Sequence, residues 1–329
     1  MWRESNRDFT VPMDTEERYL KEPDAAEWKS HLRIIGAEFR TAKDMFSLVE
    51  TVLQCLEAWD TKKLDILINN AAQTLTDSLS KEEDGIRRES LLLHGAASKN
   101  ADGGLVIDNA YAPQVRGGQV GHYLETSSRV AQRLIKNENT DSPVLSPKES
   151  ELSSWAQTIS SVSYEDVISA HSVNTFVPFI LLRELLPWMR RPKLSADVTA
   201  TNTGVVKPYS YVINVSSREG LPEDEPNHSA KAGHHVHTNM SKAALNMLTE
   251  TEAGPAWHSG KVAINSVDPG YMSADSMWMK MVGREGQACP IGWEDGVGRV
   301  LWVVAKGEIE GTPIWGRFLK HFGEIRSGR

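Results

Sequence analysis

The sequence predicts an α/β fold with a doubly wound parallel sheet, and two observations carry that prediction. Short apolar runs recur along the chain, and they are apolar on both faces, as parallel strands buried between helices are. Segments with helical periodicity separate these runs, and strands that alternate with helices are typical of this fold class. The candidate strands are residues 33–39, 64–70, 209–217 and 261–267.

The first helical segment, residues 42–59, carries its apolar residues on one face, which is typical of a helix that covers a sheet. Residues 164–189 are expected to form a second helix that bends near Pro178, because proline interrupts the backbone hydrogen bonds of a helix. A third helix is expected over 238–253.

Residues 76–163 interrupt this alternation. The segment is polar, contains glycine and has little periodicity, and such a composition offsets little of the entropy lost on ordering a chain. We therefore interpret residues 1–329 as a single α/β domain with a long surface insertion at 76–163 that is partly disordered.

Composition restricts the classes of partner. The chain has 329 residues and a net charge of −8, which disfavours binding to nucleic acid or to anionic membranes. Its first residues are charged and lack the apolar core of a secretory signal, and no apolar run reaches the length of a membrane span. The two cysteines, Cys55 and Cys289, make no disulfide framework, so a reducing, cytoplasmic location is expected.

Five segments in order along the chain carry the functional signal. They read LDILINNAAQ at 64–73, SVNTFVPFILLRELLPWM at 172–189, VINVSSREG at 212–220, HTNMSKAAL at 237–245 and INSVDPGYMSA at 264–274. Each is weak alone, but at the ends of the expected strands and helices they together resemble the short-chain dehydrogenase/reductase family, with its Rossmann-like sheet. The chain looks most similar to a fungal and plant branch that writes His-Thr-Asn-Met-x-Lys where the family has Tyr-x-x-x-Lys.

The resemblance implies four catalytic residues. Asn174 falls on the asparagine that holds a proton-relay water in the family, and Ser217 falls on the serine that orients the substrate carbonyl. Lys242 matches the family's lysine, whose charge lowers the pKa of the catalytic tyrosine. Thr238 stands four residues before Lys242, where the family has the tyrosine that donates the proton.

The resemblance also implies NAD(P) as the cofactor. In the family, the residues after the fourth strand lie beneath the adenosine half of the cofactor, and a proline–glycine turn lies beside the nicotinamide. The lysine of the active-site helix bonds the ribose. The matching residues here are Asn70, Ala71, Lys242, Pro269, Gly270 and Ser273.

Two departures from the family pattern bear on activity. A phenol has a reference pKa of about 10 that an adjacent ammonium can lower, but the hydroxyl of Thr238 is far less acidic and would be a poor general acid. The family also begins with a strand and a Gly-x-x-x-Gly-x-Gly turn that binds the pyrophosphate, whereas residues 33–39 already resemble its third strand. We therefore expect this chain to bind NAD(P) weakly or not at all; the closest substitute, VRGGQVGH at 115–122, follows no convincing strand.

Other roles for these residues stay open. Asn174 can bridge backbone groups at a helix bend, Ser217 can bond the local backbone at a strand end, and Lys242 can be a surface lysine. His237 adjoins the position of the missing tyrosine and is a candidate replacement acid–base. The histidines at 234, 235 and 237 lack the carboxylate or cysteine partners typical of a metal site, so no metal is predicted.

Two functions are compatible with these residues. The first is an NAD(P)-dependent oxidoreductase that acts on a small hydroxyl or carbonyl compound, in specialised metabolism, with an unusual acid. The second is a relative that has lost redox activity and binds a ligand or partner, or performs isomerisation or cyclisation, in the old substrate cleft. A third explanation is that the natural protein carries the glycine turn upstream of Met1. A small-molecule substrate is expected, and a homo-oligomer stays open.

The missing first two strands also predict a change in the sheet. In the family the strand order is 3-2-1-4-5-6-7, so residues 33–39 and 64–70 would lie apart by roughly 14 Å, at about 4.8 Å per strand. Unpaired backbone groups in such a gap are costly. We expect residues 33–39 to pair directly with 64–70 through a right-handed crossover. The alternatives are an exposed apolar edge at 64–70 and an N-terminal segment folded into the gap.

Overall fold

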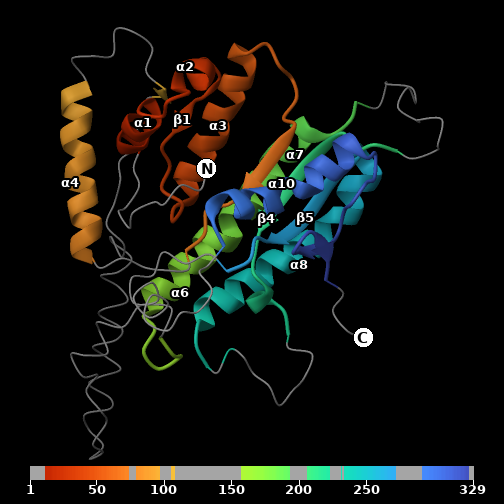
Figure 1. The fold of residues 1–329 in the computed structure, drawn as a ribbon. Helices are drawn as coiled ribbons and strands as arrows, with labels where there is room; N and C mark the ends of the chain where they lie inside the picture. Colours follow the sequence, from red (N-terminus) through yellow and green to blue (C-terminus); the bar gives the residue numbers. More distant parts are fainter. Residues whose placement is uncertain are drawn as a thin grey trace, which may run out of the picture.

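The computed structural model shows an α/β protein, which confirms the predicted fold class (Figure 1). Its larger sheet has five strands in the order β2-β4-β5-β6-β7, and a separate two-stranded sheet pairs β1 with β3. The structure describes residues 12–73, 79–96, 105–107, 157–192, 206–222, 231, 233–271 and 291–325.

The strands of the larger sheet are parallel except for the last. They are β2 (Ile66–Asn69), β4 (Ser210–Val215), β5 (Val262–Asp268), β6 (Phe318–Lys320) and β7 (Gly323–Glu324), and β7 is antiparallel to β6. β4 and β5 are buried along their whole length, as their mainly apolar sequences predict.

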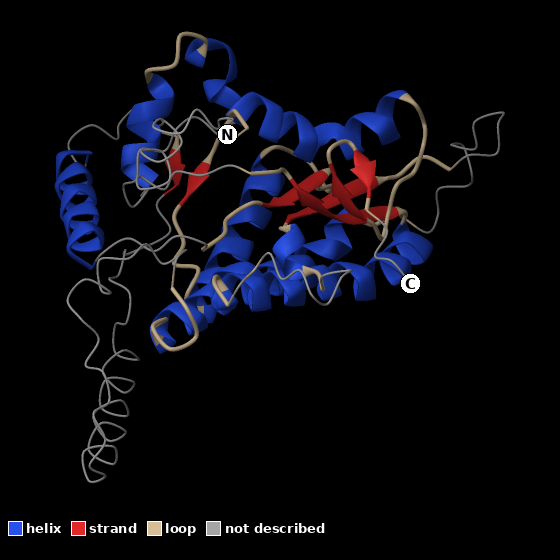
Figure 2. Ribbon diagram, turned by 60° about the horizontal axis from the view of Figure 1, so that its bottom comes forward, coloured by secondary structure: helices blue, strands red, loops and turns tan. Residues whose placement is uncertain are grey.

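Helices cover both faces of this sheet (Figure 2). On one face lie α7 (Val177–Met189) and α8 (Val236–Gly260), and on the other lies α10 (Trp293–Ile309). Neighbouring residues of β4 show the alternation, since Val212 packs against α7 and α8 while Ile213 packs against α10. The core of the domain therefore consists of two apolar layers separated by the sheet.

The helix predicted over 164–189 is present with an interruption. α6 (Tyr164–His171) continues into α7 through a π-helical turn, Ser172–Phe176. The turn lies immediately before Pro178, which occupies the first turn of α7, where the missing N–H of proline is tolerated. The extra residue of a π-turn changes which side chains face the sheet, and such turns are frequent at functional sites.

The N-terminal part of the chain forms a smaller unit beside the sheet. Its elements are α1 (Pro12–Leu20), α2 (Ala25–Trp28), a 3-10 helix (Lys29–His31), β1 (Ile34–Ile35), α3 (Ala42–Ala58), α4 (Leu79–Ala96) and β3 (Val106–Ile107). Both α4 and β3 come from the predicted insertion at 76–163, of which residues 76–78, 97–104 and 108–156 lie outside the described residues. No helix in the described ranges is both long and apolar enough to cross a bilayer.

The expected pairing of residues 33–39 with 64–70 is wrong. β1 pairs in parallel with β3, with Ile34 opposite Val106. In the described part of the chain β2 pairs only with β4, and its side chains Ile66 and Ile68 are each 38% exposed. The physical reason is that a segment after α4 provides β1 with a partner strand, which the polar composition of 76–163 did not indicate.

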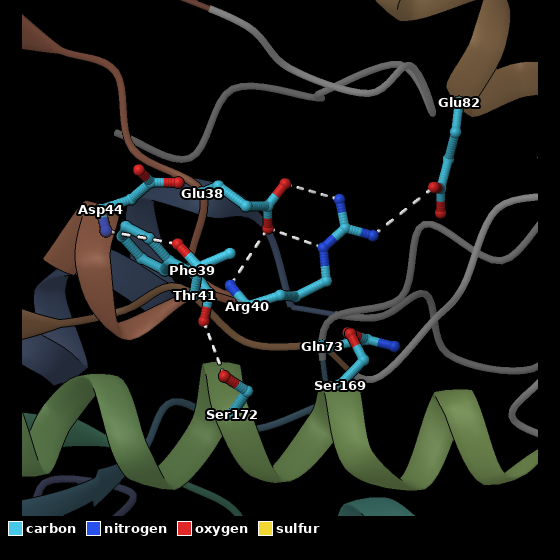
Figure 3. Close-up of polar contacts among 9 residues, drawn as sticks. All are labelled: Glu38, Phe39, Arg40, Thr41, Asp44, Gln73, Glu82, Ser169 and Ser172. Carbon is cyan, nitrogen blue, oxygen red and sulfur yellow. Dashed lines mark hydrogen bonds and ion pairs between the residues drawn. The ribbon is translucent and has the colours of Figure 1, made fainter. Parts of the chain in front are cut away.

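One polar contact attaches the N-terminal unit to the larger one, and others hold its loop between β1 and α3 (Figure 3). Ser172 Oγ donates a hydrogen bond to the carbonyl of Phe39 at 2.9 Å. Arg40 bonds both carboxylate oxygens of Glu38 at 2.6 Å and forms an ion pair with Glu82 of α4 at 3.6 Å. The loop between β1 and α3 is therefore held both to α4 and to the π-turn.

A chain of polar side chains also crosses the core. Asn69 Nδ2 donates to Asn214 Oδ1 at 2.8 Å, and Asn214 Nδ2 donates to Thr249 Oγ1 at 2.8 Å. Ser266 Oγ donates to the same Thr249 oxygen at 2.8 Å. These bonds join β2, β4, β5 and α8, so they fix the relative positions of three strand ends.

Candidate functional site

Three strands of the larger sheet end at one edge, because β2, β4 and β5 are mutually parallel. Ligands of open α/β sheets bind outside the carboxyl ends of such strands. The predicted site residues follow these ends directly. They are Asn70 and Ala71 after β2, Ser217 after β4, and Pro269 and Gly270 after β5.

Lys242 of α8 lies beneath the carboxyl end of β4. Its Nζ donates a hydrogen bond to the carbonyl of Val215, the last residue of β4, at 2.8 Å. The residue is 3% exposed, so the alternative of a surface lysine is wrong. Burial lowers the pKa of Lys242 to about 8, against an opposing effect of the nearby Asp268 carboxylate.

Asp268, at the end of β5, organises the loops around this edge. Its Oδ2 accepts hydrogen bonds from the backbone N–H of Arg218 and from Lys320 Nζ, both at 2.8 Å. Its Oδ1 accepts from the backbone N–H of Gly270 at 2.7 Å. The motif comparison did not select this residue, although a carboxylate at the end of a buried strand was a signal that could have found it.

Ser217 caps the short 3-10 helix η4 (Arg218–Gly220). Its Oγ accepts a hydrogen bond from the backbone N–H of Glu219 at 3.2 Å. The structure thus shows the local backbone contact that was the alternative to a substrate contact. The hydroxyl keeps its proton for a further acceptor, so the two roles are compatible.

Asn174 is the central residue of the π-turn and is fully buried. Its Oδ1 accepts from the backbone N–H of Gln73 at 2.8 Å, while its Nδ2 donates to the carbonyl of Gln73 at 3.0 Å and to Ser241 Oγ at 2.9 Å. Both amide hydrogens are therefore used. Asn174 bridges the loop after β2 and α8, and the motif comparison missed its partner Ser241.

Replacing Asn174 by alanine is expected to lower the free energy of unfolding by about 3 kcal/mol, because three polar groups of Gln73 and Ser241 lose their buried partner. Chemical denaturation followed by circular dichroism measures the change. Asn239→Ala, which removes a single bond of 3.3 Å to the carbonyl of His234, is the matched control and should cost below about 1 kcal/mol. Equal losses in the two variants would contradict the bridging role.

Thr238 and His237 lie in the first turn of α8 and are 1% and 0% exposed. Neither Thr238 Oγ1 nor either ring nitrogen of His237 has a hydrogen-bond partner in the described part of the chain. Burial lowers the pKa of His237; the carboxylate of Asp166 on α6 opposes this effect, and His171 adds to it. A buried hydroxyl without a partner is costly, so Thr238 is suited to bond a ligand or water.

Other predicted residues contribute less or fall elsewhere. Ala71 is exposed, and Asn70 is half-buried with an Oδ1 that has no partner among described residues. Pro269 is buried, and Gly270 adopts a φ of 100°, which favours glycine. Ser273 lies outside the described residues. Within the described ranges no group of three or more His, Cys, Asp or Glu side chains could hold a metal ion.

The described residues provide no glycine-rich turn for the pyrophosphate of NAD(P). Lys242, Pro269 and Gly270 match the nicotinamide end that the sequence resemblance implies. The pyrophosphate needs backbone N–H groups of a glycine-rich turn at a helix N-terminus. In the ranges that the structure describes, no strand leads through a turn with several glycines into a helix.

Comparison with known proteins gives distant similarities. No protein-family model matches the chain. The uncharacterized protein R665 of Acanthamoeba polyphaga mimivirus is 29% identical over 266 residues, which are 79% of this chain and 48% of that protein. The chain thus spans about half the length of the curated relative it matches.

Solved structures similar to this chain include two described as carbonyl reductases. The NADPH-bound carbonyl reductase from chicken fatty liver is 14% identical, with coverage of 97% of this chain and 95% of that chain and a TM-score of 0.47. The putative carbonyl reductase Sniffer of Caenorhabditis elegans is 14% identical, with coverage of 98% and 96% and a TM-score of 0.46.

Proposed function

We propose that the carboxyl edge of the larger sheet is the active site of a protein of short-chain dehydrogenase/reductase type that acts on a small hydroxyl or carbonyl compound. Lys242 carries this proposal. Its amino group is buried at the end of β4, one helical turn from Thr238. A cationic side chain and two hydroxyl residues, Ser217 and Thr238, at one edge suit a substrate whose oxygen gains negative charge during the reaction.

In this proposal the residues of the site bind and orient the substrate. Thr238 donates a hydrogen bond to the substrate oxygen, because its hydroxyl has no other partner in the described part of the chain. It binds this oxygen without protonating it, because a threonine hydroxyl is a poor acid. Asp268 holds η4 and the turn at Gly270 in place through its backbone contacts. NAD(P) is implied by the sequence resemblance alone. The proposal therefore includes no hydride transfer.

Thr238 also favours a second function without redox chemistry. An aliphatic hydroxyl does not protonate an alkoxide well at neutral pH, whereas it binds a carbonyl or hydroxyl oxygen readily. Ligand binding, isomerisation or cyclisation would use the same edge of the sheet and would need no pyrophosphate site.

A panel of small aldehydes, ketones and secondary alcohols separates these functions. Cofactor-dependent turnover that Lys242→Met abolishes would support the oxidoreductase. Products formed without any nicotinamide, or a ligand-induced rise in melting temperature alone, would support the second function. The assignment of the site is contradicted if no compound gives a product or a shift in melting temperature.

We expect the chain to bind NAD⁺, NADH, NADP⁺ and NADPH with dissociation constants of about 1 mM or weaker, a binding free energy of only roughly 4 kcal/mol. The physical reason is the lack of an anion site for the pyrophosphate among the described residues. Isothermal titration calorimetry at millimolar cofactor measures this. Thr238→Tyr restores a phenol but no anion site, so it should leave binding unchanged; a micromolar constant for either protein would refute the expectation.

A further inference from the structure

The amino group of Lys242 has an unusual environment for a lysine. An ammonium group offers three hydrogen-bond donors, but the described residues provide one acceptor, the carbonyl of Val215 at 2.8 Å. With 3% of the residue exposed, solvent compensates little for the other two. Lys242 also forms no ion pair within the described ranges. A buried charge with so few partners is strongly disfavoured.

The nearest carboxylate does not neutralise this charge by direct contact. Asp268 acts on Lys242 through its field, but its two oxygens are already bonded. Oδ2 accepts from Lys320 Nζ and the N–H of Arg218, and Oδ1 accepts from the N–H of Gly270. The carboxylate thus pairs with Lys320, whose side chain is 19% exposed, and leaves Lys242 without a counter-ion in contact.

Two consequences follow for the chemistry of Lys242. Burial lowers the pKa of Lys242 to about 8, so the fraction of neutral amine at neutral pH is far larger than for an ordinary lysine. The neutral amine has a lone pair and is a nucleophile, whereas the ammonium is not. In the short-chain dehydrogenase/reductase pattern a phenol would stand one turn away, but here the position holds Thr238, whose hydroxyl cannot share a proton with the amine at neutral pH.

We propose that Lys242 is a nucleophilic lysine that condenses with a small aldehyde or ketone at the carboxyl edge of the sheet to form a Schiff base. Nζ bonds to the carbonyl carbon, and proton transfer from nitrogen to oxygen gives a carbinolamine. The C–O bond then breaks, and the former carbonyl oxygen leaves as water with the second amine hydrogen. The C=N bond forms in the same step, with no oxidant, reductant or cofactor.

The hydroxyl of Thr238 is close enough in the chain to assist this reaction at Lys242. It lies one turn before Lys242 on α8 and has no hydrogen bond to any described residue. A hydroxyl there can bond the oxygen of the carbinolamine before water leaves. The proposal refines the second function above, since the imine, once it takes up a proton from solvent, is an iminium group that activates the neighbouring carbon for isomerisation or cyclisation.

Reductive trapping tests the proposal on the full chain. The protein is incubated with propanal and sodium cyanoborohydride at pH 7.5, digested, and examined by mass spectrometry. At that pH an amine with a pKa of about 8 is neutral about two hundred times more often than one at the usual value of about 10.4. We expect propyl adducts to form on Lys242 at least about tenfold faster than on Lys43 and Lys62, which are exposed references.

The pH profile of trapping separates this role from a structural one. With cyanoborohydride in excess, so that attack by the amine limits the rate, the rate at Lys242 should rise to a plateau with a midpoint at about pH 8. In Asp268→Asn the midpoint should move to lower pH, because the carboxylate that favours the ammonium is gone. Circular dichroism tests whether this variant is folded. If the variant is unfolded, the pH profile of the wild-type protein alone tests the proposal.

Trapping and turnover can fail independently. Adducts on Lys43 and Lys62 without one on Lys242, or a profile at Lys242 parallel to theirs, would overturn the Schiff base, even if cofactor-dependent turnover were found. An adduct on Lys242 with no turnover of any compound would support the nucleophile and count against the proposed function.

Discussion

Replacing Lys242 by methionine is expected to raise the free energy of unfolding at pH 7 by about 2 kcal/mol. The difference between an ordinary lysine pKa and one of about 8 corresponds to roughly 3 kcal/mol by which the buried charge destabilises the fold. Methionine has a similar length and fills the site without a charge. The increase in the free energy of unfolding is smaller than this by about 1 kcal/mol, because the carbonyl of Val215 loses its hydrogen-bond donor.

The effect of this variant should depend on pH in one direction. Below pH 8 the lysine is charged in both states, so the folded wild type carries the full penalty. Between a pH of about 8 and the unfolded value of about 10.4, the folded lysine is neutral while the unfolded one still binds a proton, so the wild type gains stability as pH rises. The advantage of the variant should therefore be gone at about pH 10.5.

Urea denaturation at pH 7, 9 and 10.5 measures both points. Lys62→Met, at an exposed position, is the matched control and should stay within about 0.5 kcal/mol of wild type at every pH. A destabilised Lys242→Met protein at pH 7 would show that the ammonium has partners that stabilise it, and it would remove the physical basis of a nucleophilic amine.

The main sheet could be predicted from the sequence because its signal is local. β4 and β5 consist mainly of apolar residues, and they are buried along their full length. The long helix between them, α8, buries one face against the sheet, with Leu245, Ala253 and Ala256 among its buried residues. Since parallel strands end at the same edge, the order of the motifs was enough to bring Ser217, Lys242 and Gly270 to one side of the sheet.

What the sequence did not reveal depends on partners far along the chain. β1 is two residues long and pairs with Val106–Ile107 of a segment that is otherwise polar. Asn174 bonds Gln73 and Ser241, which are 101 and 67 positions away. The isolation of Lys242 from carboxylates has the same origin, because it arises from the competing contacts of Asp268 with Lys320 and two backbone groups. Local patterns carry no information on such pairings.

Replacing Gly220 by alanine is expected to destabilise the protein by about 3 kcal/mol, because the new methyl group would overlap the backbone of α8. A Cβ atom on Gly220 would lie 2.6 Å from the carbonyl carbon of Lys242 and 2.7 Å from the backbone nitrogen of Ala243. Both atoms belong to the hydrogen-bonded core of a 25-residue helix, so they cannot move aside as a flexible side chain would. The clash must be relieved by shifting η4 away from α8.

That shift would act on the site as well as on stability. η4 carries Ser217 at its start and is tied to Asp268 through the N–H of Arg218. Moving it outward loosens the carboxyl end of β4, whose last carbonyl accepts the hydrogen bond of Lys242. The trapping of propanal at Lys242 should therefore lose its preference over exposed lysines in this variant, together with the loss of stability.

Gly298→Ala provides the matched control for Gly220→Ala. Gly298 lies inside α10, and a Cβ atom there would meet no atom within 4 Å. Alanine is favoured over glycine in a helix interior, so this variant should gain up to about 1 kcal/mol. Thermal and urea denaturation of the two variants should show changes in the free energy of unfolding that have opposite signs. A Gly220→Ala protein as stable as wild type would show that η4 and α8 do not approach so closely, and that the carboxyl end of β4 tolerates a displaced η4.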